Sequence, residues 1–231
     1  MNKQLPIITI DGPSGSGKGT VAGLLAERLQ WNLLDSGAIY RLHAYKALEL
    51  NIALDNEAEL VKVANNLDIK FKQSRESNHI LAFLDNHEIT AKIRTETVGA
   101  AASKSSIYQS VRSALLIKQQ SFVKAPGLVA DGRDMGSVVF PHAQVKIYLD
   151  ASCVVRAKRR QKQLQEAGVD VKFAALLDEV MARDHRDKTR TVSPLVIPDG
   201  AVVINTDDMK AEQALERLML LIKRKINIRM E

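Results

Sequence analysis

The chain has 231 residues, of which 45% are hydrophobic, so it can form one domain with insertions around a substantial core. Its net charge of +6 fits anionic partners, namely nucleic acid, acidic membranes or small polyanionic substrates. A single cysteine, Cys153, excludes a disulfide framework and a cysteine metal cluster, and an aromatic content of 4% argues against a surface that stacks single-stranded bases.

Nothing in the sequence predicts a membrane segment. There is no run of about 18 apolar residues, and residues 1–6 are too short and too polar for a signal peptide. We therefore expect a cytoplasmic protein.

The most informative stretch is a glycine-rich turn between a predicted strand and a predicted helix. An apolar run at residues 7–10 precedes it, and an amphipathic helical pattern follows it up to Leu29. Glycines let successive N–H groups point at one anion, and the start of a helix adds free donors. Because a chance turn would rarely combine these flanks with four glycines, we predict a P-loop that binds nucleotide phosphates. Its residues are Gly12, Pro13, Ser14, Gly15, Ser16, Gly17, Lys18, Gly19 and Thr20.

The segments after the first helix change in character at residue 69. Residues 31–34 predict a second strand that ends in a loop at residues 35–37, and residues 41–50 and 58–67 predict helices. Residues 69–72 alternate in polarity, and residues 80–84 and 87–89 flank Asp85-Asn86, which is a two-residue hairpin signal. These short strands predict an inserted antiparallel β subdomain, with a surface hairpin of no functional role as the alternative.

The remaining segments alternate between helices and strands. Helices are predicted at residues 95–125, 152–166, 173–181 and 212–226, and strands at residues 128–130, 145–149 and 201–204. This alternation predicts an α/β fold with a parallel five-stranded sheet covered by helices on both faces. Residues 1–38, 95–151 and 191–231 would form the P-loop core, residues 39–94 an insert and residues 152–190 a short helical lid. Ligands bind beyond the carboxyl ends of such strands.

Arginine is concentrated in the second half of the chain. It binds phosphate through two N–H groups at once and never loses its charge, so a reaction between two polyphosphates needs several arginines. Solvated surface arginines and a helix with internal salt bridges are the alternatives. The candidates are Arg41, Arg94, Arg112, Arg133, Arg156, Arg159, Arg160, Arg183, Arg186 and Arg190. The five histidines share no spacing with carboxylates that would build a metal site.

Five segments resemble the bacterial-type cytidylate kinases (CMP kinases), which belong to the nucleoside monophosphate kinase family of P-loop kinases. They span nearly the whole chain in the order of that family. Gly19 stands where the strict P-loop has Ser or Thr, and GKGT is the variant seen in nucleoside monophosphate kinases. The segments are residues 8–20 (ITIDGPSGSGKGT), 33–41 (LLDSGAIYR), 129–140 (VADGRDMGSVVF), 145–151 (VKIYLDA) and 183–190 with 193–195.

The resemblance implies transfer of the γ-phosphoryl group of ATP to CMP or dCMP in pyrimidine nucleotide metabolism. ATP would bind at residues 12–20, with Mg²⁺ on its phosphates and no side chain as a clear direct metal ligand. Asp131 could hold the waters of that ion. The negative charge on the migrating phosphoryl group would be stabilised by Lys18, Arg133, Arg156, Arg159 and Arg190.

The acceptor side follows from the same motifs. Ser36 and Arg41 would serve the monophosphate, and Arg133 and Arg190 would take phosphate. Ser103 and Arg112 would meet the cytosine edge, with Asp134 near the exocyclic amine. The ribose hydroxyls would be bound by Arg183 and Asp187.

Two other functions compete with this one. The first is a P-loop kinase for another small acceptor such as UMP, and the second is a P-loop protein that binds nucleic acid through the basic tract at residues 156–162. We expect ATP and CMP or dCMP as partners, with no nucleic acid and no membrane. We also expect a monomer.

The sequence also predicts a conformational change. We expect that without ligands the insert and residues 152–190 stand away from the P-loop and close when both nucleotides bind.

Overall fold

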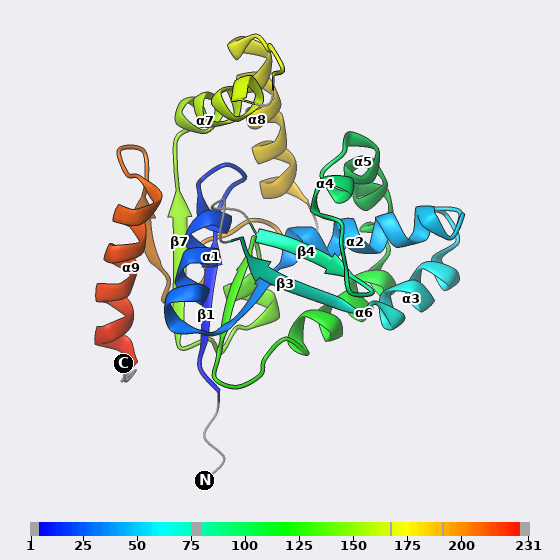
Figure 1. Ribbon diagram of the computed structural model, residues 1–231, viewed down its shortest axis with the longest axis horizontal. Helices are drawn as coiled ribbons and strands as arrows, with labels where there is room; N and C mark the ends of the chain where they lie inside the picture. The colour runs from blue at the N-terminus through cyan, green and yellow to red at the C-terminus, as the bar shows by residue number, and fades with distance from the viewer. Residues whose placement is uncertain (1–4, 75–79, 167, 191, 227–231) are drawn as a thin grey trace.

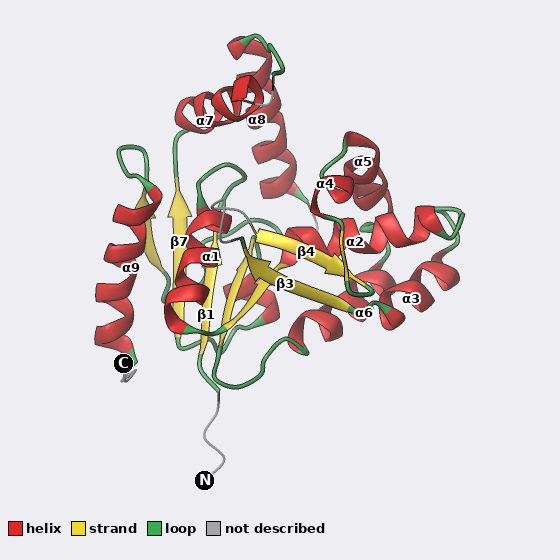
Figure 2. Ribbon diagram, in the orientation of Figure 1, coloured by secondary structure: helices red, strands yellow, loops and turns green. Residues whose placement is uncertain are grey.

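The computed structural model describes residues 5–74, 80–166, 168–190 and 192–226 (Figure 1). Its centre is a parallel sheet in the order β2-β6-β1-β7-β8. Figure 2 draws all strands in yellow, with β1 and β7 of this sheet labelled. The strands are β1 (Ile7–Asp11), β2 (Asn32–Asp35), β6 (Leu128–Gly132), β7 (Val145–Asp150) and β8 (Val202–Asn205). Ile8 and Ile10 of the central strand are fully buried, as expected for a sheet that is covered on both faces. The predicted five-stranded parallel sheet is confirmed.

Helices cover this sheet from both sides. α1 (Lys18–Leu29) packs on β1 and β6 and lies beside α9 (Ala211–Lys225). On the other face, a single π-helical turn, η1 (Met135–Val139), contacts β1 where Thr9 and Asp11 point. Right-handed crossovers place α1 and η1 on opposite faces, because one connection runs toward β2 and the other toward β7.

The predicted antiparallel subdomain is present. β3 (Ile69–Gln73), β4 (Ile80–Leu84) and β5 (His87–Glu88) form a three-stranded antiparallel sheet that follows α3 (Glu57–Asn66). Asp85 and Asn86 have φ values of 50° and 65°, which are the positive angles that a tight two-residue hairpin needs.

The prediction of a single long helix at residues 95–125 is wrong. The chain forms α5 (Glu96–Ser105) and α6 (Gln109–Gln120) in this range, preceded by the short helix α4 (Thr90–Ile93). The hydroxyls of Ser105 and Ser106 donate to carbonyls three residues back, at 3.4 and 3.0 Å, and Tyr108 is extended, so local hydrogen bonds end the helix. α5 packs on α2 (Ser36–Glu49), and α6 packs on α3. The predicted boundary at residues 94 and 95 therefore runs between helices that pack on each other. The division of the chain into a core and an insert stays a prediction.

Two helix boundaries also differ from the sequence analysis. The loop expected at residues 35–37 is absent because Asp35 caps α2 directly, accepting a hydrogen bond from the Ala38 N–H at 2.9 Å. Ser36 and Arg41 therefore lie on one helix. The helix expected at residues 173–181 continues as α8 (Phe173–Thr189), which places Arg183 and Asp187 one turn apart.

The segment predicted as a lid comprises α7 (Cys153–Glu166) and α8, which project beyond the carboxyl end of the sheet in Figure 1. The base of this lid is in contact with the P-loop, since Arg156 Nη1 donates to the Ser14 carbonyl at 3.0 Å. The expectation that all of residues 152–190 stand away from the P-loop is therefore wrong at the base of α7. Among the residues that the structure describes, no helix has the length and apolar character needed to cross a membrane.

Candidate active site

The turn between β1 and α1 has the backbone of an anion cradle. Gly12, Gly15 and Gly17 have φ values of 148°, 81° and 89°, which side chains on other residues would disfavour. A Cβ on Gly12 would lie 2.1 Å from the Leu149 carbonyl oxygen, so only glycine fits there. Gly17 precedes α1 and makes no side-chain cap, which leaves the first N–H groups of the helix to point at an anion.

Lys18 lies at the centre of this cradle. Its Nζ donates to the Pro13 carbonyl at 3.1 Å. Burial lowers the pKa of the Lys18 ammonium, while the nearby charge of Asp131 raises it and the charges of Arg133 and Arg183 lower it further. An incoming phosphate would replace the carbonyl as partner and stabilise the charged lysine.

Asp131 explains why glycine follows Lys18. A Cβ on Gly19 would lie 3.2 Å from Asp131 Oδ2, so the carboxylate occupies the space that a Ser or Thr side chain would take. Burial raises the pKa of Asp131 to about 7, with Lys18 opposing the shift. Its buried Oδ1 has no hydrogen-bond partner within the described part of the chain, although carboxylate oxygens in such places are normally bonded.

Arg133, Arg183 and Arg190 lie close together, and the first two are near enough to Lys18 for their charges to act on it. Arg133 Nε donates to Asp187 Oδ2 at 2.6 Å, so two predicted site residues form an ion pair. Burial and the charge of Arg133 lower the pKa of Arg183 to about 10. The pKa of Arg190 is lowered by burial first, with Arg133 adding to the effect. This concentration of half-buried positive charge is unfavourable by itself and suits a polyanion.

The predicted base-edge residues are partly assembled. Arg112 Nη2 lies 3.7 Å from Asp134 Oδ2, and its guanidinium lies 5.4 Å from the centre of the Tyr40 ring. Tyr40 was missed by the sequence analysis, although it directly precedes Arg41 in one of the family segments. Ser103 lies exposed on α5.

The residues expected on the monophosphate side lie on α2. Ser36 is buried at the first position of the helix. Arg41 Nη1 donates to the carbonyls of Ile93 and Thr95, at 2.9 and 3.2 Å. Arg41 thereby ties α2 to the junction of α4 and α5.

Arg156 differs from its expected role. Its five N–H groups are used by the Ala151 and Ser14 carbonyls, both carboxylate oxygens of Asp184 and the Cys153 sulfur. The side chain is 3% exposed and paired with a buried carboxylate. A guanidinium that is saturated in this way ties α7 to α8 and to the P-loop and has no donor left for phosphate.

Arg159 is also bound to protein. Its Nη2 donates to the Thr206 carbonyl, and its Nη1 lies 3.3 Å from the Thr206 hydroxyl. Thr206 is 3% exposed and its hydroxyl lies 3.0 Å from the Ser16 carbonyl, so it joins the loop after β8 to the P-loop. No motif in the sequence predicted Thr206. Arg159 still borders the cradle, since a Cβ on Gly17 would lie 3.9 Å from its Nη1.

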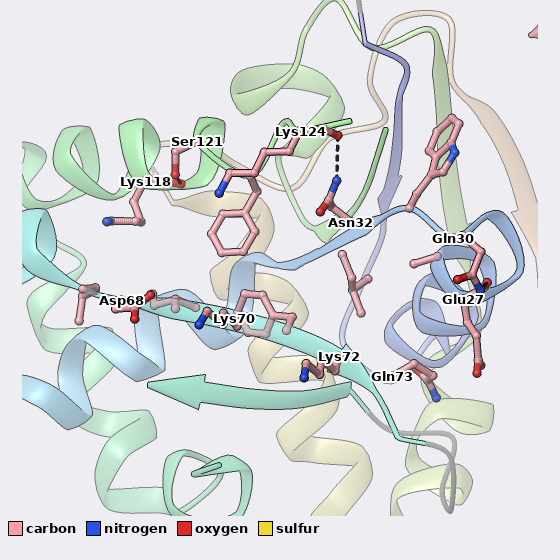
Figure 3. Close-up of a pocket in the computed structure, with 17 residues that line it drawn as sticks. Glu27, Gln30, Asn32, Asp68, Lys70, Lys72, Gln73, Lys118, Ser121 and Lys124 are labelled. Carbon is pink, nitrogen blue, oxygen red and sulfur yellow. Dashed lines mark hydrogen bonds between the residues drawn. The ribbon is translucent and has the colours of Figure 1, made fainter. Parts of the chain in front are cut away.

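A separate groove of about 610 Å³ lies away from this site, between β3, the start of β2 and the end of α6 (Figure 3). Lys70, Lys72, Lys118 and Lys124 line it, together with Phe71. The hydrogen bond between the Asn32 side chain and the Lys124 carbonyl, at 2.8 Å, crosses one end. No P-loop residue lines this groove.

Comparisons of the sequence with known proteins find similarity to cytidylate kinases. The cytidylate kinase family model matches residues 8–224. A cytidylate kinase from Aeromonas salmonicida is 50% identical over 95% of this chain and 94% of its own length. Those from Aeromonas hydrophila and Shewanella oneidensis are 52% and 47% identical, over 93% and 98% of this chain and 93% and 99% of their own lengths.

Proposed function

The chain belongs to the cytidylate kinase family, and we propose that it transfers the γ-phosphoryl group of ATP to CMP or dCMP, giving ADP and CDP or dCDP. The observation that carries this proposal is the concentration of half-buried positive charge beside the P-loop. Lys18 feels the charges of Arg133 and Arg183, and Arg190 feels that of Arg133. Two polyphosphates that must approach each other need their repulsion offset in this way.

On the donor side, residues 12–20 would hold the ATP phosphates through backbone N–H groups and Lys18. Lys18 would exchange the Pro13 carbonyl for the β- and γ-phosphates. We propose that Arg156 and Arg159 act there indirectly, by holding the P-loop, α8 and the Thr206 loop together, because their donors are bound to protein.

On the acceptor side, Ser36 and Arg41 would bind the monophosphate, and Arg133 and Arg190 would stabilise the charge on the migrating group. Arg183 with Asp187 would hold the ribose hydroxyls. Arg112, Asp134 and Ser103 would read the cytosine edge, with Tyr40 supporting Arg112. No general base is needed, because the CMP phosphate is already an anionic nucleophile.

Cytidylate kinases are ATP-dependent kinases that generally use a divalent metal, and we propose Mg²⁺ here. The described residues contain no group of three His, Cys, Asp or Glu side chains that could bind a metal directly. The buried, unpartnered Oδ1 of Asp131 fits a residue that orients waters of a phosphate-bound ion. Mg²⁺ would neutralise charge on the phosphates, while Asp131 and Lys18 fix its surroundings.

The test is an ADP-release assay with ATP and a panel of acceptors: CMP, dCMP, UMP, AMP and shikimate. We expect CMP or dCMP to give the highest kcat/KM. UMP as the best acceptor would favour the alternative, and a best acceptor outside the pyrimidine monophosphates would contradict both. The Lys18→Ala variant should lose about 3 kcal/mol of transition-state stabilisation. Lys158→Ala, on the exposed face of α7, is its control.

We propose ATP and CMP or dCMP as the partners of a monomeric protein that binds neither nucleic acid nor membrane. Two arginines of the basic tract at residues 156–162 argue against nucleic-acid binding. Arg156 and Arg159 donate hydrogen bonds to protein groups instead of facing solvent. A gel-shift titration at about 0.15 M salt, a physiological ionic strength, checks it, and a complex at that salt would favour the nucleic-acid alternative.

A further inference from the structure

Asp11 is a buried carboxylate that the proposed function does not use. It is the last residue of β1, directly before Gly12 of the P-loop, and none of its surface is exposed. Its Oδ1 accepts a hydrogen bond from the Met135 N–H and its Oδ2 accepts one from the Gly136 N–H, both at 2.8 Å. These are the first two N–H groups of η1, which have no partner within their own helical turn.

The two N–H groups that Asp11 binds belong to residues directly after two predicted site residues. Met135 and Gly136 directly follow Arg133 and Asp134, which we place on the acceptor side of the site. One carboxylate at the end of β1 therefore joins the start of the ATP loop to the end of the acceptor loop. Gly136 also lies tightly against β1, since a Cβ there would be 2.8 Å from Thr9 Oγ1.

A carboxylate in this place needs a reason. Burial raises the pKa of Asp11 to about 6, and the N–H groups of Gly136 and Met135 lower it, so the group is mostly ionised at neutral pH. Burying a charge costs more than burying an apolar side chain of similar size. An ionised carboxylate accepts one N–H on each of its two oxygens, whereas Asn has one acceptor oxygen and would turn a donor toward the second N–H.

From this geometry we propose that Asp11 is a positioning residue, which fixes the loop carrying Arg133 and Asp134 at a set distance from the P-loop so that acceptor and donor meet. It touches neither nucleotide. This inference rests on the proposed function for its activity readout, but the contact itself can be tested on the protein without ligands.

The first arm measures hydrogen exchange in the ligand-free Asp11→Asn protein. The Met135 and Gly136 amides should exchange at least about tenfold faster than in the wild type, because at least one hydrogen bond is lost and a donor faces a donor. Amides of the flanking strand β6 should keep their rates. The matched control is Asp150→Asn at the end of the adjacent strand β7, whose Oδ1 accepts a hydrogen bond from the neighbouring Ala151 N–H. Unchanged exchange at Met135 and Gly136 would overturn the proposal.

The second arm separates positioning from general stability. In Asp11→Asn, the KM for CMP should rise about tenfold while the Kd for ATP alone stays within about twofold. In the double variant Asp11→Asn/Asp134→Asn, the rise in the KM for CMP should be smaller than the product of the two single effects, because both residues act through one loop. Equal losses for both nucleotides, or full multiplicativity, would show a merely structural role.

A third variant covers the case in which Asp11→Asn does not fold. Gly136→Ala leaves the carboxylate intact but pushes the same loop away from Thr9, and it should produce the same selective rise in the KM for CMP. A wild-type protein that releases no ADP with CMP would refute the proposed function, and the exchange arm would still decide whether Asp11 holds the loop.

Discussion

Arg156 on α7 and Arg183 on α8 belong to the same pair of packed helices, yet their guanidinium groups have opposite surroundings. Arg156 is saturated by carbonyls, a thiol and the buried carboxylate of Asp184. Arg183 is half-buried beside the positive charges of Arg133 and Arg41, with Asp187 as the first of the opposing charges. The first guanidinium is neutralised within the protein, whereas the second lies among like charges, as expected for a group that binds an anion. Residue type alone therefore does not separate a structural arginine from one that we propose to bind substrate.

The largest expected effect is on the structural arginine. Arg156→Met would leave Asp184 buried without its partner, and breaking such a pair costs about 3–5 kcal/mol. For a chain of this length, this corresponds to a fall in Tm of about 10 °C. Thermal unfolding measures it, with Arg160→Met, exposed on the same helix, as the control. A Tm that did not change, together with a large loss of turnover, would break the comparison by making Arg156 a substrate ligand.

Arg183→Met should show the opposite pattern. Loss of a charged hydrogen bond to substrate should lower kcat/KM by the equivalent of about 2–3 kcal/mol of transition-state stabilisation. The Tm should stay constant or rise, because repulsion between residue 183 and Arg133 is relieved. Steady-state kinetics and thermal unfolding on the same preparation check both halves. Arg186→Met, exposed on the same helix, should change neither. A lower Tm with normal kinetics would place Arg183 in the structural class.

Arg112 gives a test within the acceptor side. Arg112→Met should raise the KM for CMP by the equivalent of about 1–3 kcal/mol and leave the KM for ATP unchanged, because a polar base edge would lose its partner. The control is Lys118→Met on the same helix, which lines the groove away from the P-loop. Equal effects on both substrates would indicate that Arg112 only supports the fold through Tyr40 and Asp134.

The smallest effect concerns pH and Asp131. Its pKa is raised in the folded protein to about 7, so between that value and its ordinary 3.8 the folded state binds a proton that the unfolded state releases. The stability contribution is therefore present at low pH and is lost as the pH rises through about 7. Asparagine does not titrate, so the stability of Asp131→Asn relative to the wild type should rise by about 1.4 kcal/mol between pH 6 and pH 8. Ligand-free unfolding free energies at both pH values measure it, and a relative gain at pH 6 alone would reverse the assigned sign.

The sequence by itself determined the elements whose signals are local. A glycine-rich turn between an apolar strand and an amphipathic helix needs no distant partner to be read, and the Asp85-Asn86 hairpin has its own turn chemistry. The same holds for the five strands, since apolar runs between helices imply a parallel sheet. Motif order then identified the family, and with it the candidate residues on both sides of the site.

Tertiary structure decided what depends on partners far away in the chain. The break at Ser105 and the start of α2 at Ser36 come from side-chain hydrogen bonds that propensity does not show. The hydrogen bonds of Arg156 are made with Asp184, Ser14 and Ala151, two of which come from other elements. The contacts of Thr206 and Asp11 could not be predicted from the sequence, although Asp11 lies within a family segment, because they join loops that only the folded sheet brings together. A side chain's charge is fixed by its type, but whether that charge is already neutralised depends on its neighbours in three dimensions.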